Sequence, residues 1–296
     1  MCDSRIYEYL LPTYVFLPPS TPVVPAEPSE TLPKSTPEEM EEKRRYRIPT
    51  DTLNTVKMAF KTYEGTYNYH NFTIGKDPKE KTCQRYIMSF DVDEPKMIQN
   101  TEWLSLKVHG QAFMLHQIRK MVGLVVIVVR SGTPLTLIPH TFEHAKINIP
   151  KAPGIGLLLE QAIANLELHL NHSYHVRFPQ LLRVIQPIFS SYNKRMEKES
   201  REKIDFKVYR DEIEAFKQKW IYQKIFEEEL SDNSFDDWIK AVDAHTTTDF
   251  GYLNPEGIIP DSAIVRPGVG RYAAPGGGGG ARDLDAEDEE VGDEDG

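Results

Sequence analysis

Apolar residues along the chain recur with two different periods, and the period predicts the type of each element. In residues 104–109, LSLKVH, leucine and valine alternate with polar side chains, which is typical of a β-strand with one buried face. The run RYIMSFDV at residues 85–92 alternates in the same way, and the apolar run LLLEQAI at residues 157–163 is strand-like. Residues 4–16, SRIYEYLLPTYVF, are rich in aromatic and branched side chains and also predict a strand.

Helices are predicted where apolar residues recur at spacings of three and four. In a helix that starts at Thr50 or Asp51, one face carries Leu53, Val56, Phe60 and Tyr63. In residues 112–130, the same spacing is followed by Met114, Leu115, Ile118, Met121, Val122 and Val125. The β-branched run VVIVV at residues 125–129 is also compatible with a strand, but the length of the segment favours a helix. Residues 211–230 predict a further helix.

Two segments lack the apolar content that folding requires. Residues 18–45 are dense in proline, glutamate, serine and threonine, and residues 251–296 are rich in glycine and proline before they turn acidic. Such segments cannot bury enough apolar surface to offset the loss of conformational entropy. We therefore predict a disordered insertion and a flexible tail.

The formal net charge of −10 is unevenly distributed. Residues 282–296 carry a net charge of −8, whereas residues 41–160 carry 17 basic and 12 acidic side chains. A mildly basic body is compatible with a nucleic-acid partner despite the acidic total. The two cysteines, Cys2 and Cys83, exclude a disulfide framework, and the charge-free stretch at residues 121–129 is too short to span a bilayer.

The predicted helix at residues 112–130 carries polar groups that an apolar segment does not need. His116, Arg119 and Lys120 are three and four residues apart, so they can project from one flank, and a solvated strip is the simplest interpretation. Basic and aromatic side chains of neighbouring segments favour an RNA surface instead, because phosphates attract cations and unstacked bases stack on flat rings. These predicted RNA-binding residues are Lys107, His109, Tyr67, Tyr69 and His70.

Three further patterns contain residue types that could carry chemistry. Arg5, Tyr7 and Tyr9 share one face of the first strand, either as an aromatic ladder or to present a phenol to a substrate base, and the pattern favours neither. The histidines His169, His172 and His175 lack a nearby ligand pattern, so a surface cluster is favoured over a metal site. The Gly-x-Gly of residues 154–156 has no phosphate-loop context, so no nucleotide cofactor is predicted.

Five motifs occur in an order that resembles one family. They are RIYEY (5–9), GTYNYHNFT (65–73), TCQRYI (82–87), GQAFMLHQIRKMVG (110–123) and KAPGIGLLLE (151–160). Together they closely resemble the C-terminal half of TruA-type tRNA pseudouridine synthases, and among these most of all the eukaryotic multi-site enzymes. The resemblance covers about residues 2–165 apart from the insertion.

The resemblance implies an α+β fold: an antiparallel sheet with helices on one face, the C-terminal half of the pseudouridine synthase fold. The expected organisation is a first strand at 1–17, the disordered insertion at 18–45, the remainder of the domain at 46–165, a helical C-terminal extension at 166–250 and the disordered tail at 251–296.

The resemblance also implies a reaction without cofactor or metal, in which uridine of tRNA, and of other structured RNA, is isomerised to pseudouridine. In such enzymes an Asp attacks the nucleoside. By this resemblance, Tyr7 corresponds to the tyrosine that stacks on the flipped base. Arg119 corresponds to the arginine that pairs with the Asp, and Leu157 corresponds to the apolar residue under the base. His116 aligns with a helix histidine whose role is left open. By resemblance the location is the nucleus, with the mitochondrion as the alternative.

One expected segment does not occur in the sequence. The family's catalytic Asp lies in an Arg-Thr-Asp-Lys-Gly segment, whereas Thr-Asp is found here only at Thr50-Asp51 and Thr248-Asp249, in other contexts. We therefore expect the N-terminal catalytic domain to be missing and this chain alone to be inactive. Two other hypotheses are a non-catalytic RNA-binding remnant of such an enzyme and a scaffold that acts through its acidic tail.

Overall fold

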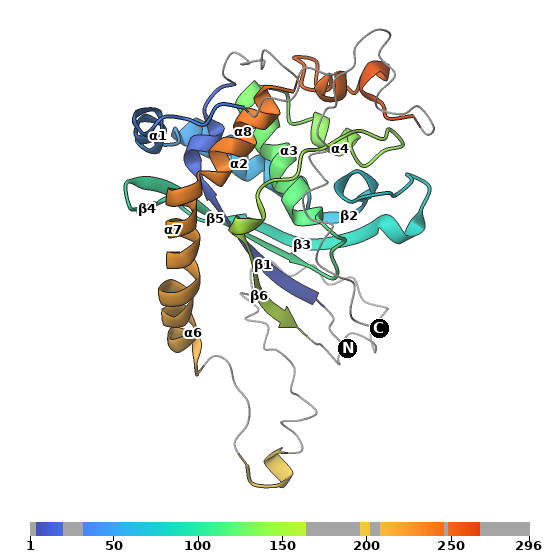
Figure 1. Cartoon of the computed structure of the whole chain (residues 1–296). Helices are drawn as coiled ribbons and strands as arrows, with labels where there is room; N and C mark the ends of the chain where they lie inside the picture. The colour runs from blue at the N-terminus through green and yellow to red at the C-terminus, as the bar shows by residue number, and fades with distance from the viewer. Residues whose placement is uncertain (1–3, 20–31, 164–195, 202–207, 246–247, 267–296) are drawn as a thin grey trace.

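An antiparallel β-sheet lies at the centre of the protein (Figure 1). The computed structural model describes residues 4–19, 32–163, 196–201, 208–245 and 248–266. The strands are β1 (Ser4–Pro12), β2 (Gly65–Asn68), β3 (Gln84–Val92), β4 (Lys96–Ile98), β5 (Thr101–Gly110) and β6 (Leu157–Ile163). They are ordered β2-β3-β5-β1-β6, with β4 paired to β5, so β1 is an inner strand between β5 and β6. The predicted α+β fold with an antiparallel sheet is confirmed.

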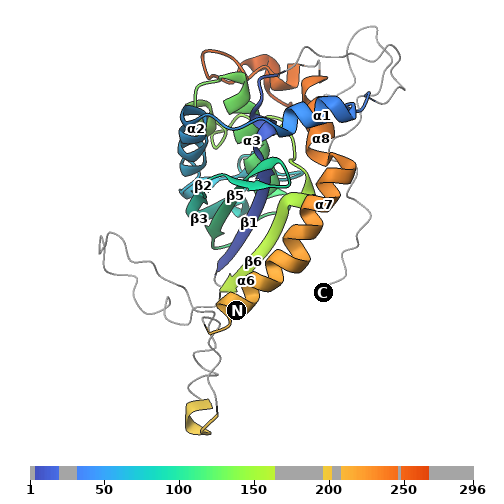
Figure 2. The ribbon, with the colours of Figure 1, turned by 90° about the vertical axis from the view of Figure 1, so that its left-hand side faces the viewer.

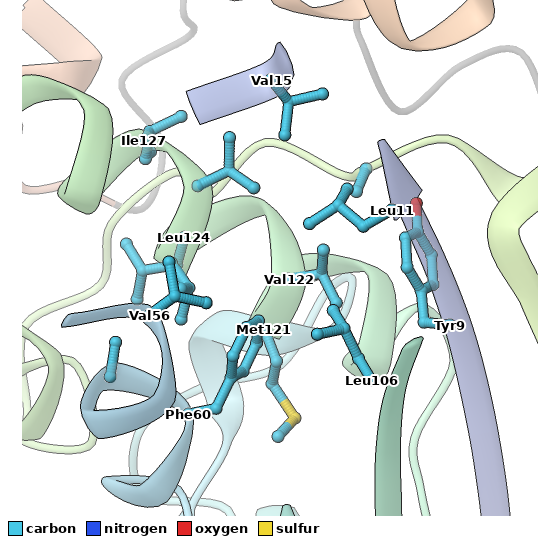
Figure 3. Close-up of a cluster of buried hydrophobic side chains, with 14 of the residues drawn as sticks. Tyr9, Leu11, Val15, Val56, Phe60, Leu106, Met121, Val122, Leu124 and Ile127 are labelled. Carbon is cyan, nitrogen blue, oxygen red and sulfur yellow. The ribbon is translucent and has the colours of Figure 1, made fainter. Parts of the chain in front are cut away.

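Helices α2 (Thr50–Lys61) and α3 (Gln117–Ser131) cover one face of this sheet. The alternation of β1 and β5 sends Tyr9, Leu11 and Leu106 toward this layer, where they meet Met121 and Val122 of α3 (Figure 3). All five side chains are completely buried. Burial of such side chains contributes about 1.5 to 3 kcal/mol each, so this interface is a main source of the stability of the domain.

The segment that enters β6 passes very close to α3 and β1 because glycines leave room for its backbone. A Cβ atom on Gly123 of α3 would lie 2.1 Å from the carbonyl oxygen of Pro150. A Cβ atom on Gly156 would lie 2.4 Å from the carbonyl oxygen of Leu10. The backbone nitrogen of Ala152 also donates to the carbonyl oxygen of Arg119 at 3.2 Å. These contacts fix the start of β6 relative to both α3 and β1.

A second helical layer packs on the other face of the sheet. It consists of α6 (Arg210–Phe216), the π-helical turn η6 (Lys217–Tyr222) and α7 (Gln223–Asp232). The next helix, α8 (Ser234–Asp243), leaves this layer and lies beside α1 (Pro37–Arg44) and α3 (Figure 2). In Figure 2, α6 and α7 run along β6, and Trp103 of β5 packs against Phe226 with the ring centroids 4.8 Å apart. The sequence predicted these helices without placing them, so the structure adds a layer to the predicted one-sided arrangement.

The predicted disorder of residues 18–45 is wrong for its last part. Helix α1 (Pro37–Arg44) begins with a capping box between Thr36 and Glu39, buries Met40, and joins Lys43 to Asp236 of α8. The composition of the segment hid this helix because its stability comes from contacts with distant residues. Residues 20–31 lie outside the described residues.

The body of the domain extends into the predicted tail. The hydroxyl of Tyr252, which is fully buried, donates to the carbonyl oxygen of Asn148 at 2.7 Å. The backbone nitrogen of Val265 donates to the carbonyl oxygen of Lys146 at 2.7 Å. The predicted disorder from residue 251 is therefore wrong up to residue 266, and residues 267–296 lie outside the described residues.

Two predicted elements differ in detail. The helix predicted at 112–130 begins at Gln117, because His116 adopts the left-handed conformation with φ of 61°. A bulge in β3 interrupts its alternation between Ile87 and Ser89, so Ile87 is fully buried while Tyr86 is 44 % exposed. Within the described ranges, no helix has both the length and the apolar character needed to cross a lipid bilayer.

Candidate functional site

Tyr7 lies in the middle of the sheet, where β1 is paired on both sides. It is opposite Val108 of β5 and Leu159 of β6, and its side chain points to the same face as Tyr9. The ring is half-buried and meets the ring of Phe113 edge-on, with centroids 5.3 Å apart. The structure therefore presents the Tyr7 ring beside an aromatic wall, partly open to solvent.

Arg119 projects from the first turn of α3 and is also half-buried. Its Nε donates to the carbonyl oxygen of Ala152 at 2.6 Å. A Cβ atom on Gly154 would lie 3.5 Å from the guanidinium carbon. Because the loop of residues 150–156 lies against this side chain, the loop backbone sets the direction of the guanidinium.

Leu157 begins β6 directly after that loop and is half-buried. Leu157 is paired with Tyr9 of β1, which is two residues from Tyr7. The side chains of Leu157 and Tyr7 therefore both face the α3 side of the sheet. The three residues that the resemblance assigned to catalysis, Tyr7, Arg119 and Leu157, are thus brought to one side of the sheet by β1, α3 and the loop before β6.

Tyr9 and Tyr7 share one face of β1 but differ in their surroundings. The ring of Tyr9 is fully buried and its hydroxyl donates to the carbonyl oxygen of Pro153 at 2.6 Å. Burial raises the pKa of the Tyr9 hydroxyl well above its usual value, so it stays protonated. Tyr9 is therefore a structural residue that anchors the loop, whereas the half-buried Tyr7 is the accessible phenol.

Lys107 and His109 point to the opposite face of the sheet from Tyr7. Lys107 forms an ion pair with Asp93 at 3.3 Å, and His109 is buried with its Nε2 2.9 Å from the hydroxyl of Ser4. Burial lowers the pKa of His109, which disfavours a charged imidazole. The two residues alternate with the core side chains as predicted, but the structure does not bring them to the face of the proposed site.

Several other residues predicted to contact RNA are buried. The hydroxyl of Tyr69 donates to the carbonyl oxygen of Tyr63 at 2.8 Å, and Nε2 of His70 lies 3.2 Å from the carbonyl oxygen of Ala145. Exposure is 0 % for Tyr69, 1 % for His70 and 4 % for Lys120. Their burial does not support direct RNA contact by these three residues. The sequence did not predict this burial, because spacing along the chain does not reveal which distant segments cover a residue.

Tyr67 and His116 remain accessible on the segments around the site, and the side chain of Lys107 is 39 % exposed on the opposite face. Tyr67 is 38 % exposed and stacks on Phe142 with ring centroids 4.5 Å apart, so one face of its ring is covered. His116 is half-buried at the N-cap of α3. In the described residues no group of three or more histidine, cysteine, aspartate and glutamate side chains is placed to hold a metal ion. The histidines His169, His172 and His175 lie outside the described residues.

Comparisons with known proteins match the part of the sequence that forms these strands and α3. Residues 59–163, which contain Arg119 and Leu157, match the family described as tRNA pseudouridine synthase. The chain contains a domain of the tRNA pseudouridine synthase family. The matched range begins after β1, so Tyr7 lies outside it, although β1 is an inner strand of the same sheet.

Relatives of this tRNA pseudouridine synthase domain occur in fungi and in mouse. The tRNA pseudouridine synthase 1 of Yarrowia lipolytica is 34 % identical over 323 residues, which cover 87 % of this chain and 56 % of that protein. The protein of the same name from Schizosaccharomyces pombe is 41 % identical over 216 residues, 73 % of this chain and 36 % of that protein. The pseudouridylate synthase 1 homolog of Mus musculus is 31 % identical and covers 91 % of this chain and 54 % of that protein. The chain spans about half the length of these curated relatives or less.

The tRNA pseudouridine synthase domain also contains residues near the site that the sequence analysis did not single out. Phe113, whose ring contacts Tyr7, lies inside the family motif of residues 110–123, but its position in the sequence does not indicate this contact. The backbone carbonyl of Ala152, which orients Arg119, has no sequence signal, because any residue has a carbonyl group. Both contacts depend on how the loops before α3 and β6 fold over the sheet.

Proposed function

We propose that this domain forms one wall of the active site of an enzyme that isomerises uridine in tRNA to pseudouridine. The observation that carries the proposal is the presence of Tyr7, Arg119 and Leu157, all half-buried, on one side of the sheet. They combine a phenol, a guanidinium and an apolar side chain, which suit a flat uracil base and an anionic nucleophile. The family membership and the names of the relatives support the same reaction.

The reaction rearranges bonds within one nucleoside. The N1–C1′ bond breaks, a C5–C1′ bond forms, the C5 proton leaves and N1 gains a proton, so no cofactor is needed. In our proposal Tyr7 stacks on the flipped base and assists the departure of the C5 proton, while Leu157 supports the other side of the base. The target base must leave the RNA stack, and stacking on Tyr7 offsets part of that cost of a few kcal/mol.

Arg119 is proposed to pair with the nucleophilic carboxylate. A planar guanidinium that stays charged is the strongest partner for a carboxylate in a partly dry pocket, where it favours the ionised form. The 296 residues contain no Arg-Thr-Asp-Lys-Gly segment. We propose that the carboxylate belongs to an N-terminal catalytic domain and that the domain described here completes the site.

The test is tritium release from tRNA that carries tritium at C5 of uridine, with enzyme produced from the whole reading frame that includes this chain. Tyr7→Phe and Arg119→Ala are expected to lower the rate at least 100-fold while the circular dichroism spectrum stays unchanged. The matched controls are Tyr209→Phe and Arg210→Ala, because both residues are exposed on or beside α6, behind the sheet. Near-normal release by either test variant would show that the residue does not have the proposed role.

The lack of the Arg-Thr-Asp-Lys-Gly segment also favours one alternative, a protein that binds RNA without modifying it. The genomic sequence upstream of the first codon separates the two. An in-frame Arg-Thr-Asp-Lys-Gly segment supports the enzyme, whereas stop codons followed by a promoter support the RNA-binding remnant. A nuclear location is part of the proposal and is tested by microscopy of the tagged whole protein.

A further inference from the structure

A β-bulge lies directly beside Tyr7. In the pairing of β1 with β6, Ile6 is opposite Gln161 and Tyr7 is opposite Leu159, so Glu160 is an extra residue without a partner on β1. A bulge bends the strand that contains it and changes the local twist, and it can re-aim a neighbouring side chain. The conformation of β6 at Glu160 therefore influences where the ring of Tyr7 points.

A single lysine on the other face of the sheet holds both strands at this point. Nζ of Lys217 lies 3.1 Å from the carboxylate of Glu160 and 3.0 Å from that of Glu8, the residue next to Tyr7 in β1. The side chains of Lys217 and Glu8 are only 9 % and 5 % exposed. A buried charge is stable only while its partners stay within contact distance, so the positions of Lys217, Glu8 and Glu160 depend on one another.

Both carboxylate oxygens of Glu8 also accept hydrogen bonds from hydroxyl groups. The hydroxyl of Ser105 on β5 donates to Oε1 at 2.6 Å, and the hydroxyl of Tyr222 donates to Oε2. Burial alone would raise the pKa of Glu8, but the hydrogen bonds from Ser105 and Tyr222 and the charge of Lys217 lower it overall. Glu8 is therefore an ionised carboxylate that links β1 to β5 and to the helical layer.

The π-helical turn η6 explains how Lys217 reaches this position. Residues five apart are nearly above one another in a π turn, because its hydrogen bonds join residues i and i+5. Lys217 and Tyr222 have this spacing, and Nζ of Lys217 lies 5.1 Å from the centre of the Tyr222 ring. In an α-helix the same two side chains would be separated by about 140° around the axis. The turn thus puts both groups on the face that meets Glu8.

We propose that Lys217, together with Glu8 and the bulge residue Glu160, positions Tyr7 for the reaction from the opposite face of the sheet. These three are positioning residues, because none of them lies on the face of the site. Lys217 fixes the bulge through Glu160 and fixes the strand through Glu8, so the peptide units on either side of Tyr7 have one conformation. The role of these three residues in the reaction rests on the proposed function, whereas their effect on the position of the Tyr7 ring does not.

Two carboxylates on the same lysine provide a matched pair of variants. Glu214 of α6 lies 3.7 Å from Nζ of Lys217, and its side chain is 53 % exposed. The side chain of Glu160, which occupies the bulge, is 28 % exposed. Glu160→Ala and Glu214→Ala each remove one negative charge from Lys217, and neither empties the core. Only Glu160→Ala releases the bulge beside Tyr7.

The first readout needs no activity. The 296-residue chain is labelled with 3-fluorotyrosine, and the resonance of Tyr7, one of 14 tyrosines, is assigned by its loss in Tyr7→Phe. We expect Glu160→Ala to shift or broaden the Tyr7 fluorine resonance, and Glu214→Ala to leave it in place. A Tyr7 resonance that is the same in the Glu160→Ala chain and the original chain would overturn the proposal.

The second readout is tritium release by the whole enzyme. We expect Glu160→Ala to lower kcat about tenfold with little change in KM, because the base still binds but Tyr7 is misplaced. Glu214→Ala should stay within about twofold of the original. Equal kcat values for the two variants would overturn the catalytic part of the proposal. If the original whole enzyme releases no tritium, the proposed function fails, and the fluorine resonance of Tyr7 still decides whether the cluster positions that ring.

Discussion

Glu229 of α7 is a carboxyl group that the fold buries almost completely. It is 3 % exposed, and its oxygens accept hydrogen bonds from the hydroxyl of Tyr14 at 2.5 Å and from the backbone nitrogen of Phe235 at 3.2 Å. Burial raises its pKa to about 7, because these two bonds only partly replace hydration of the charge. Glu229 therefore titrates near neutral pH in the folded chain.

This raised pKa predicts that stability falls as the pH rises. Between about pH 4.5 and pH 7 the folded chain keeps a proton on Glu229 that the unfolded chain has lost, so the free energy of unfolding decreases over this range. Glu229→Gln should remove this decrease, which amounts to about 3 kcal/mol at most. Urea unfolding at pH 5 and pH 8 measures it, with the exposed Glu228→Gln as the control. An equal pH dependence in both variants would contradict the assignment.

Single residues in β1 show what a sequence can and cannot predict. The two-residue period correctly places Tyr7 and Tyr9 on one face and Glu8 on the other. The period does not reveal that Tyr9 is sealed by the loop of residues 150–156, or that Glu8 meets Lys217 more than 200 residues later. Those facts depend on long-range packing, for which a single sequence has no local signal.

At the scale of whole elements, a buried ion pair joins α3 to α8. Arg130 makes two hydrogen bonds to the carboxylate of Asp243, one of them 3.0 Å long, and its Nε donates to the carbonyl oxygen of Leu17 at 3.0 Å. The two side chains are 4 % and 7 % exposed. This pair attaches the C-terminal helices to the helix that carries Arg119.

Removing one partner of this pair should be costly. Asp243→Ala leaves the guanidinium of Arg130 buried without its carboxylate, so we expect a loss of about 3 to 5 kcal/mol in the free energy of unfolding. Chemical denaturation measures the loss, and Asp237→Ala on the exposed side of the same helix is the control. A loss below about 1 kcal/mol would mean that the pair does not hold α8 to α3.

The close approach of α3 to the loop before β6 gives a further prediction. Gly123→Ala places a Cβ atom 2.1 Å from the carbonyl oxygen of Pro150, so the loop and the helix must separate. We expect a loss of about 1 to 3 kcal/mol in stability, together with lower tritium release because Ala152 no longer orients Arg119. Gly154→Ala, whose Cβ atom would make ordinary contacts at 3.5 Å, should cost much less in thermal unfolding. Equal losses in the two variants would contradict the account of this contact.

Helices and strands were predicted correctly where the apolar periodicity is strong. They were missed where contacts with distant residues determine the local structure. The spacing of Leu53, Val56 and Phe60 locates α2, and the alternation in residues 104–109 locates β5. Helix α1 was missed because its composition is that of a disordered segment, and it is held by Met40 and Lys43 against the rest of the fold. The bulges in β3 and β6 were missed because an extra residue leaves no mark in the apolar pattern.

At the scale of the whole molecule, the sheet separates two groups of side chains. The face toward α3 carries Tyr7, Arg119 and Leu157, and the face toward α6 and α7 carries the Lys217 cluster. The predicted RNA-binding surface was divided between these faces, because alternation along β5 sends Lys107 and His109 away from Tyr7. The family motifs that carry Tyr7, Arg119 and Leu157 form β1, α3 and the start of β6, which meet on the α3 side of the sheet, and the roles of the three residues stay predictions.

The same separation guides the interpretation of the chain as part of a larger enzyme. The chain spans about half of its curated relatives or less, and the domain supplies a guanidinium and a phenol but no Arg-Thr-Asp-Lys-Gly segment. The proposal therefore requires that the α3 face meets a second domain that carries the nucleophile. The back of the sheet is covered by this chain's own α6 and α7 (Figure 2), whereas the half-buried Tyr7 and Arg119 lie on the α3 side, where we expect that contact.

The most direct test of the central claim is a single-turnover measurement of tritium release from C5 of tRNA uridine by the enzyme from the whole reading frame. The proposed role of Arg119 predicts rapid release by the original enzyme and by Arg210→Ala, and release at least 100-fold slower by Arg119→Ala. Release by Arg119→Ala at the original rate would contradict the claim that this guanidinium balances the nucleophilic carboxylate.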